Sequence, residues 1–250
     1  MILKKWKYIP NELKNTNTKK YYDILSKKKF SLIVKRLFDL IVSAVLLILL
    51  SPIMLIIAIA IKLDSKGPVF YRQERVTTNN KTFKIFKFRT MVQNADKKGS
   101  LITLGRDPRI TRVGNLIRKC RLDELPQVIN ILIGDMSFVG TRPEVRKYVE
   151  CYTDEMKATL FMKAGVTSIA SIRYRNEDDV MNKYINLGES VDDVYVNRVL
   201  PDKMKYNLEY IEKFNVLYDI KILLDTVLAV LRIKKVEEVE EPVEQEKKEA

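Results

Sequence analysis

Two adjacent carboxylates, Asp123 and Glu124, are the residues whose types and spacing most directly suggest chemistry. They stand in the stretch RLDELPQVINILIG, which begins at Arg121. As a simple helix cap, Asp123 would begin a helix that Gly134 ends. That interpretation explains neither Glu124 nor the basic residues around the pair, which are Arg106, Arg109, Arg112, Arg118, Lys119, Arg121 and Arg142.

The chemistry that such a pair could perform is phosphoryl transfer. A helix N-terminus surrounded by arginines suits phosphate groups, because backbone N–H groups and guanidinium groups both bind them. Aspartate has a reference pKa of about 3.9 and needs no activating base, and we expect nearby arginines to lower the pKa of Asp123 further. A carboxylate can attack phosphorus and form an aspartyl phosphate. The second carboxylate could hold Mg²⁺ together with substrate phosphates, so Asp123 and Glu124 are also candidate metal ligands.

The composition limits the alternatives. The 250 residues include no histidine, which excludes a Ser-His-Asp triad and every histidine metal site. Two cysteines, Cys120 and Cys151, do not make a disulfide framework, and we expect the catalytic part to lie in the reducing cytosol. The net charge of +13 predicts a polyanionic partner, which could be nucleic acid, an anionic membrane or a phosphorylated substrate.

A membrane segment precedes these residues. The run from Leu40 to Ile61 carries no charge and, as a helix, could reach about the 30 Å of a bilayer core. Ser51-Pro52 falls in its middle, where proline predicts a break or kink. Because both flanks are basic, the positive-inside rule favours a re-entrant helix-break-helix with both ends on the cytoplasmic side over a straight span. A core helix of a soluble protein is disfavoured because the run is about twice a mean globular helix.

The remaining elements follow from local patterns. Residues 1–34 are polar and Lys-rich, and we expect a flexible basic arm. Val69–Tyr71 and Phe83–Phe88 flank a TTNNK turn and predict a small β-hairpin. Its basic and aromatic residues could bind single-stranded nucleic acid, but a half-buried strand with a charged outer face explains them equally simply. Helical patterns are predicted at about 110–119, 125–133, 144–163 and 203–232.

The C-terminal part adds an amphipathic helix and a tail. The apolar stripe of the last helix is typical of a core helix and also suits a helix that lies in the membrane interface. Residues 233–250 predict a charged disordered tail. The expected architecture is therefore α+β and predominantly helical, with a small β-hairpin or sheet, a re-entrant membrane hairpin at 35–64, a cytosolic catalytic domain at 65–232 and interfacial amphipathic helices.

Several blocks together resemble one family. KRLFDL, the apolar run broken at Ser51-Pro52, GPVFYRQERV, FKIFKFRTM, DPRITRVGNLIRK, LDELPQVINILIGDMSFVGTRPE and AGVTSIASIRYRNE are similar in order and spacing to the monotopic phosphoglycosyl transferases of bacterial glycoconjugate synthesis. The resemblance runs from about Lys35 to Arg232. It implies transfer of a sugar-1-phosphate from a UDP-sugar to undecaprenyl phosphate at the cytoplasmic face of the bacterial inner membrane, with release of UMP.

The resemblance also implies roles for individual residues. Asp123 matches the family's nucleophile, which forms a covalent phosphosugar intermediate, and Glu124 would help hold Mg²⁺ or assist the lipid acceptor. Arg118 and Arg142 match arginines near the phosphates. Lys87 and Arg89 match a basic block that we assign to substrate binding or to the scaffold.

Two motifs depart from the family pattern. Gly140-Thr141-Arg142-Pro143 stands where the family commonly has Gly-Pro-Arg-Pro, and Ala164-Gly165-Val166-Thr167-Ser168 stands where it has Pro-Gly-Ile-Thr-Gly. These changes leave the expected reaction type unaltered, but they weaken any transfer of sugar specificity.

Two rival functions follow from the same residues. In one, the sugar phosphate is transferred directly and Asp123 only binds metal. In the other, the chain is a membrane-tethered basic protein that binds nucleic acid or anionic lipid without catalysis, and its binding would depend steeply on salt. The enzyme interpretation calls for a UDP-sugar, undecaprenyl phosphate and a membrane as partners, and for no nucleic acid.

Overall fold

The computed structural model describes residues 3–95 and 107–230, and within these ranges the protein is mostly helical with three two-stranded sheets. This agrees with the predicted α+β class. The helices are α1 (Thr16–Lys27), α2 (Lys29–Asp64), α3 (Arg112–Lys119), α4 (Gln127–Ile133), α5 (Arg146–Val149), α6 (Ile169–Arg173), α7 (Glu177–Ile185), α8 (Val191–Val194), α9 (Leu200–Lys213) and α10 (Val216–Val230). The strands are β1 (Phe70–Tyr71), β2 (Glu74–Thr77), β3 (Lys81–Lys84), β4 (Lys87–Phe88), β5 (Met136–Val139) and β6 (Ala164–Thr167). Short turns η1 (Trp6–Tyr8), η2 (Asn11–Leu13), η3 (Thr78–Asn80), η5 (Leu122–Glu124), η6 (Met156–Phe161) and η7 (Tyr195–Val199) connect them.

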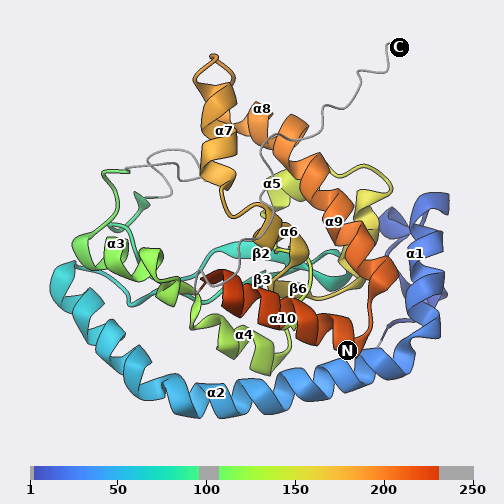
Figure 1. Ribbon diagram of the computed structural model, residues 1–250, viewed down its shortest axis with the longest axis horizontal. Helices are drawn as coiled ribbons and strands as arrows, with labels where there is room; N and C mark the ends of the chain where they lie inside the picture. Colours follow the sequence, from blue (N-terminus) through green and yellow to red (C-terminus); the bar gives the residue numbers. More distant parts are fainter. Residues whose placement is uncertain (1–2, 96–106, 231–250) are drawn as a thin grey trace.

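The apolar segment forms one long helix, α2, which curves along one side of the domain from α1 to α3 (Figure 1). Of the break or kink expected at Ser51-Pro52, the break is absent, because the helix continues through Pro52. Pro52 has no N–H to donate to the carbonyl of Ile48, four residues earlier. The hydroxyl of Ser51 donates to that carbonyl instead, at 2.8 Å. α2 is long and apolar enough to cross a membrane, and its topology there stays a prediction.

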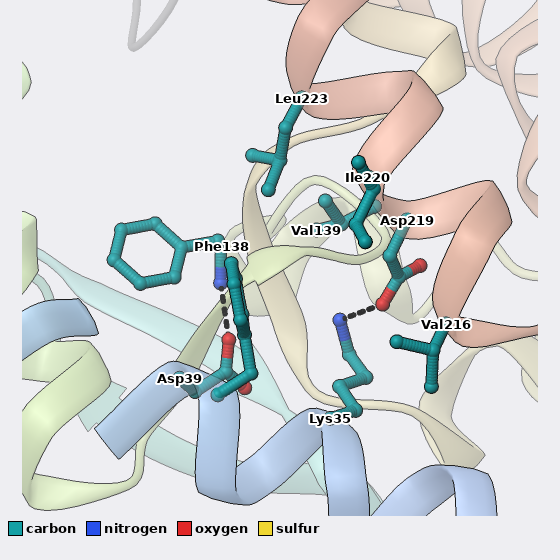
Figure 2. A pocket seen from close by; sticks show the side chains of 9 residues that line it. Lys35, Asp39, Phe138, Val139, Val216, Asp219, Ile220 and Leu223 are labelled. Carbon is teal, nitrogen blue, oxygen red and sulfur yellow. Dashed lines mark hydrogen bonds and ion pairs between the residues drawn. The ribbon is translucent and has the colours of Figure 1, made fainter. Parts of the chain in front are cut away.

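Three charged residues of α2 attach it to three different elements. Lys35 forms an ion pair of 2.5 Å with Asp219 of α10, and both side chains are buried. Asp39 accepts a hydrogen bond of 3.1 Å from the backbone N–H of Phe138 in β5. Figure 2 shows both contacts around a mostly apolar hollow between α2, β5 and α10. Arg36 donates to carbonyls at the C-terminal end of α4. The KRLFDL motif therefore joins α2 to the rest of the domain.

The N-terminal segment is packed, so the expectation of a flexible arm at residues 1–34 is wrong for the residues described. α1 begins at a capping box formed by Asn15 and Thr18. The rings of Trp6 and Tyr22 meet Phe161 edge to face, at 6.3 and 6.0 Å between ring centroids. The apolar side chains of this segment show only a weak helical periodicity, because they pack against core residues that lie far along the chain.

The predicted hairpin is confirmed. β2 pairs antiparallel with β3, and β1 with β4. Asn79 and Asn80 both have φ of 58°, a left-handed conformation that asparagine adopts more readily than most residues. The pairing brings Lys87 of β4 close to the chain segment that precedes α4.

The secondary structure predicted for the second half of the chain is correct in part. Helices α3 and α4 match the patterns at 110–119 and 125–133, and Gly134 ends α4 in a left-handed conformation. The helix expected over 144–163 is instead α5 followed by η6. The helix expected over 203–232 is two helices, α9 and α10, separated at Phe214. Strands β5 and β6, which pair in parallel, were not predicted.

The apolar stripe of α10 points outward. Leu217, Leu224 and Val227 are exposed, whereas Ile222 and Ala229 face the domain. Of the two interpretations of this stripe, the structure favours an interfacial helix over a core helix. The tail at 233–250 lies outside the described residues.

Candidate active site

Asp123 and Glu124 lie in the short turn η5, between α3 and α4. The neighbouring side chains of Leu122 and Leu125 pack into an apolar cluster with the second half of α2. α4 begins at Gln127, and no side chain caps it. The interpretation of Asp123 as a helix cap is therefore wrong. The pair is instead held on a turn that rests on the long apolar helix.

The turn is entered through a strained residue. Arg121 has φ of 56° and ψ of 19°, the left-handed region. This conformation costs a non-glycine residue roughly 1–2 kcal/mol. Arg121 lies between α3 and η5, and the two carboxylates follow it within that turn. Such strain at a polar turn is typical of functional sites.

Glu124 is paired with a lysine from a distant strand. Lys87 Nζ lies 2.7 Å from Glu124 Oε1, and about a fifth or less of each side chain is exposed. Burial alone would raise the pKa of Glu124, but the positive charges of Lys87 and Arg142 outweigh it and lower the pKa to about 2. Glu124 is therefore anionic at every physiological pH, and its charge is balanced within the protein.

Asp123 has the opposite environment. Burial raises its pKa, and the charge of Glu124 adds to the rise, while Lys87, Arg118 and Arg121 oppose it. The expectation that arginines would lower this pKa is therefore wrong, because burial outweighs them. Among the residues that the structure describes, no side chain forms a hydrogen bond or ion pair with the Asp123 carboxylate. The carboxylate is only partly buried and is available to a ligand.

Arg142 faces Glu124 across a polar hollow. Arg75, Lys87, Glu124, Gln127 and Arg142 all line it. Burial opposes the charged form of Arg142, but the negative charges of Glu124, Glu177 and Glu144 raise its pKa above the usual value. The hollow thus holds three cationic side chains and one carboxylate, a balance that suits a phosphorylated ligand.

Two glycines set the backbone beside Arg142. A Cβ on Gly140 would lie 2.2 Å from the carbonyl oxygen of Lys163, and a Cβ on Gly165 would lie 2.2 Å from the nitrogen of Gly140. Only glycine allows β5 and β6 to approach this closely. Both Gly140 and Gly165 belong to the motifs that depart from the family pattern, and both departures keep the glycine.

The other predicted site residues do not all lie beside the carboxylate pair. Arg118 acts on Asp123 through its charge, as expected of a residue beside the pair. Arg89 does not join the group: its guanidinium donates to the carbonyls of Ser65, at 2.7 Å, and Lys66, just beyond the C-terminal end of α2. Of the two roles assigned to Arg89, substrate binding or scaffold, these contacts favour the scaffold role. Ser51 and Pro52 are exposed in the middle of α2.

Sequence reasoning missed three residues of this region. Arg75 lines the hollow and donates to the carbonyl of Pro143 at 3.0 Å. Gln127 is buried on the first turn of α4 and lines the same hollow. Glu177 of α7 forms an ion pair of 2.6 Å with Lys203 and contributes to the charge around Arg142. Arg75 lies in the polar and charged strand ERVT, so neither it nor Glu177 carries a sequence signal that singles it out.

The donor set suits a magnesium ion only together with a substrate. In the described ranges, no group of three or more acidic or cysteine side chains could enclose a metal. Magnesium commonly takes one or two carboxylates and completes its coordination with substrate phosphates and water. Asp123 and the second oxygen of Glu124 meet that requirement, whereas Oε1 of Glu124 is occupied by Lys87.

Comparison with known proteins identifies the family of the chain. A family model described as bacterial sugar transferase matches residues 30–233. A UDP-N-acetylgalactosamine-undecaprenyl-phosphate N-acetylgalactosaminephosphotransferase of Aeromonas hydrophila is 35% identical over 177 residues, which is 70% of this chain and 38% of the relative. A UDP-glucose:undecaprenyl-phosphate glucose-1-phosphate transferase of Escherichia coli K12 is 39% identical over 176 residues, 68% of this chain and 34% of the relative. An uncharacterized sugar transferase of Bacillus subtilis, EpsL, is 34% identical over 171 residues, 68% of this chain and 74% of the relative. The chain thus spans little more than a third of the length of the first two relatives.

Proposed function

This chain belongs to the bacterial sugar transferase family, and on that premise we propose that it transfers a sugar-1-phosphate from a UDP-sugar to undecaprenyl phosphate and releases UMP. The two transferases from Aeromonas and Escherichia are named for different UDP-sugars, so the proposal leaves the sugar open. In a bacterium, such a transfer would be the first membrane step of polysaccharide or glycoconjugate synthesis.

The observation that carries the proposal is the contrast between the two carboxylates. Glu124 is held by Lys87, whereas Asp123 has no partner among the described residues and stands beside cationic groups. In the first step, an oxygen of Asp123 attacks the sugar-bearing phosphorus of the UDP-sugar. A bond forms between that oxygen and the phosphorus, and the bond from the phosphorus to the bridging oxygen breaks. The electron pair leaves with UMP.

The second step regenerates the enzyme. A phosphate oxygen of undecaprenyl phosphate attacks the phosphorus of the aspartyl phosphosugar, and the acyl phosphate bond breaks. The product is an undecaprenyl diphosphate sugar, and Asp123 is again a free carboxylate. Lys87, Arg118 and Arg142 supply positive charge for the phosphates in both steps.

We assign Mg²⁺ to Asp123 and Glu124 as a part of the proposal. When bound, the ion would neutralise charge on the donor phosphates. Lys87 orients Glu124 through an ion pair that is formed between protein groups alone.

The apolar outer surface supports a membrane location. Side chains along α2, such as Phe30, Ile48 and Leu63, are exposed, and those of α10 add to the same kind of surface. Exposed lysines lie at both ends of α2, at Lys29 and Lys62. We therefore place both ends of α2 and the catalytic residues on the cytoplasmic face, with α2 entering a single leaflet.

Two rivals make different predictions. Direct transfer without a covalent intermediate would leave no phosphosugar on Asp123. A binding protein without catalysis is disfavoured by the family, and it would turn over no nucleotide.

The proposal is tested by nucleotide release from membranes that contain the protein, supplied with Mg²⁺, undecaprenyl phosphate and a panel of UDP-sugars. We expect UMP from one donor and a phosphosugar adduct on Asp123 by mass spectrometry of the intact protein. Asp123→Asn should abolish both and leave stability within about 0.5 kcal/mol, because the side chain has no described partner to lose. Release of UDP, or turnover without adduct in a rapid-quench experiment, would overturn the covalent mechanism.

A further inference from the structure

The ion pair between Lys87 and Glu124 joins two parts of the chain that are 37 residues apart. Lys87 belongs to β4, at the end of the connection that leaves β3. Glu124 belongs to the turn that leads into α4. The position of the ammonium group therefore depends on how the connection between β3 and β4 lies against α4.

β4 is held on one side by its pairing with β1, and one side chain of α4 forms hydrogen bonds to the connection itself. Asn130 of α4 is fully buried. Its Oδ1 accepts a hydrogen bond of 2.7 Å from the backbone N–H of Phe86, and its Nδ2 donates at 3.1 Å to the carbonyl of Lys84. The amide thus pairs with two backbone groups on either side of Ile85, as a neighbouring strand would. Phe86 immediately precedes Lys87.

The other end of α4 is held separately. Arg36 donates to the carbonyls of Ile131 and Leu132 at 2.7 and 3.1 Å, and Lys163 donates to the carbonyl of Gly134. These contacts attach α4 to α2 and to the segment before β6. They do not touch the connection that carries Lys87, so they cannot replace the contacts of Asn130.

We propose that Asn130 is a positioning residue that sets Lys87 against Glu124 and thereby completes the charge arrangement around Asp123. It acts through Lys87 and touches no reacting atom. Its amide is needed because one group must accept from an N–H and donate to a carbonyl at the same time. Aspartate has the same shape but only accepts, and leucine does neither. The proposal has two consequences. The geometric one, the position of Lys87 against Glu124, stands by itself, whereas the catalytic one, the reactivity of Asp123, rests on the proposed function.

The geometric consequence is tested on the full-length protein in membranes by acylation of lysines with an amine-reactive ester, followed by site-resolved mass spectrometry. Asn130→Asp should raise the labelling rate of Lys87 at least fivefold, because the amine is no longer held by Glu124. The matched control is Asn207→Asp. Asn207 is also a buried asparagine, but it lies in α9 and its Nδ2 contacts the sulfur of Met204. The control should leave Lys87 labelling within twofold of the wild type.

The catalytic consequence is tested by the rate of adduct formation on Asp123 in a double-mutant cycle with Lys87→Met. Asn130→Asp should slow adduct formation at least tenfold in the wild-type background and less than twofold in the Lys87→Met background. A residue that only fills the core would slow both backgrounds by the same factor. If Asn130→Asp does not fold, Asn130→Ser replaces it in the same experiments. The serine hydroxyl can form a hydrogen bond with one of the two backbone groups.

The outcomes separate the two proposals. Unchanged Lys87 labelling in a folded Asn130 variant overturns the positioning role, and so does an equal loss of rate in both backgrounds. A wild-type protein that forms no adduct overturns the proposed function, and Asn130 is then judged by Lys87 labelling alone.

Discussion

The charge of Lys87 should make a large contribution to the stability of the fold, and Lys87→Met measures it. The pKa of Glu124 is lowered from 4.5 to about 2, which corresponds to a net stabilisation of its charged form by about 3 kcal/mol, after the cost of burial has been offset by its charged neighbours. Lys87 is the first of these neighbours and Arg142 the second. We therefore expect Lys87→Met to lower the free energy of unfolding by about 2 kcal/mol at pH 7.

The pH dependence has a definite sign. A carboxylate whose pKa is depressed in the folded state contributes stability above its unfolded pKa, and that stability is lost as the pH falls toward the folded pKa. For Glu124 this window runs from about pH 4.5 to about pH 2. The difference in stability between wild type and Lys87→Met should therefore be constant near neutral pH and should narrow as the pH falls through this window.

The assay is denaturant unfolding in detergent, followed by the fluorescence of Trp6, the single tryptophan, which packs against Tyr22. Lys157→Met is a matched control. Lys157 forms an ion pair with Asp154 at the same 2.7 Å, but this pair is much more exposed. Its loss should cost less than about 0.5 kcal/mol, because water already screens the charges. Equal losses in the two variants, or a difference that does not narrow in acid, would refute the reasoning.

Three further predictions concern the scaffold. Lys35→Met should lower the free energy of unfolding by about 3–5 kcal/mol, because the buried carboxylate of Asp219 loses its cationic partner and keeps the hydrogen bond from Tyr210, and thermal unfolding measures this loss. Gly165→Ala should destabilise the protein by more than about 2 kcal/mol in the same assay, since its Cβ would overlap the backbone of Gly140. Deletion of residues 1–27 should expose core side chains and lower the melting temperature by more than about 5 °C, whereas a flexible arm would leave it unchanged.

Local chemistry made several elements predictable from the sequence. The hairpin follows from its asparagine-rich turn, and α4 from apolar periodicity that ends at Gly134. The adjacent carboxylates and the basic residues around them were visible in the same way. The family could be recognised because its motifs occur in order, and the match over residues 30–233 agrees with that.

Other features depend on contacts between distant residues, and no local pattern carries them. The strands β5 and β6 pair in parallel, although the residues between them were predicted to form one helix over 144–163. Tyr22 of α1 packs against Phe161, and Arg89 donates to a carbonyl just beyond the end of α2.

The carboxylate pair itself shows where the division falls. The sequence alone determined that Asp123 and Glu124 are neighbours in a basic region, because residue types and order are local facts. Only the tertiary structure decided that Lys87 pairs with Glu124 and that burial raises the pKa of Asp123. Burial and ion pairing depend on which distant groups the fold brings within a few ångströms, and two identical local sequences can differ in both.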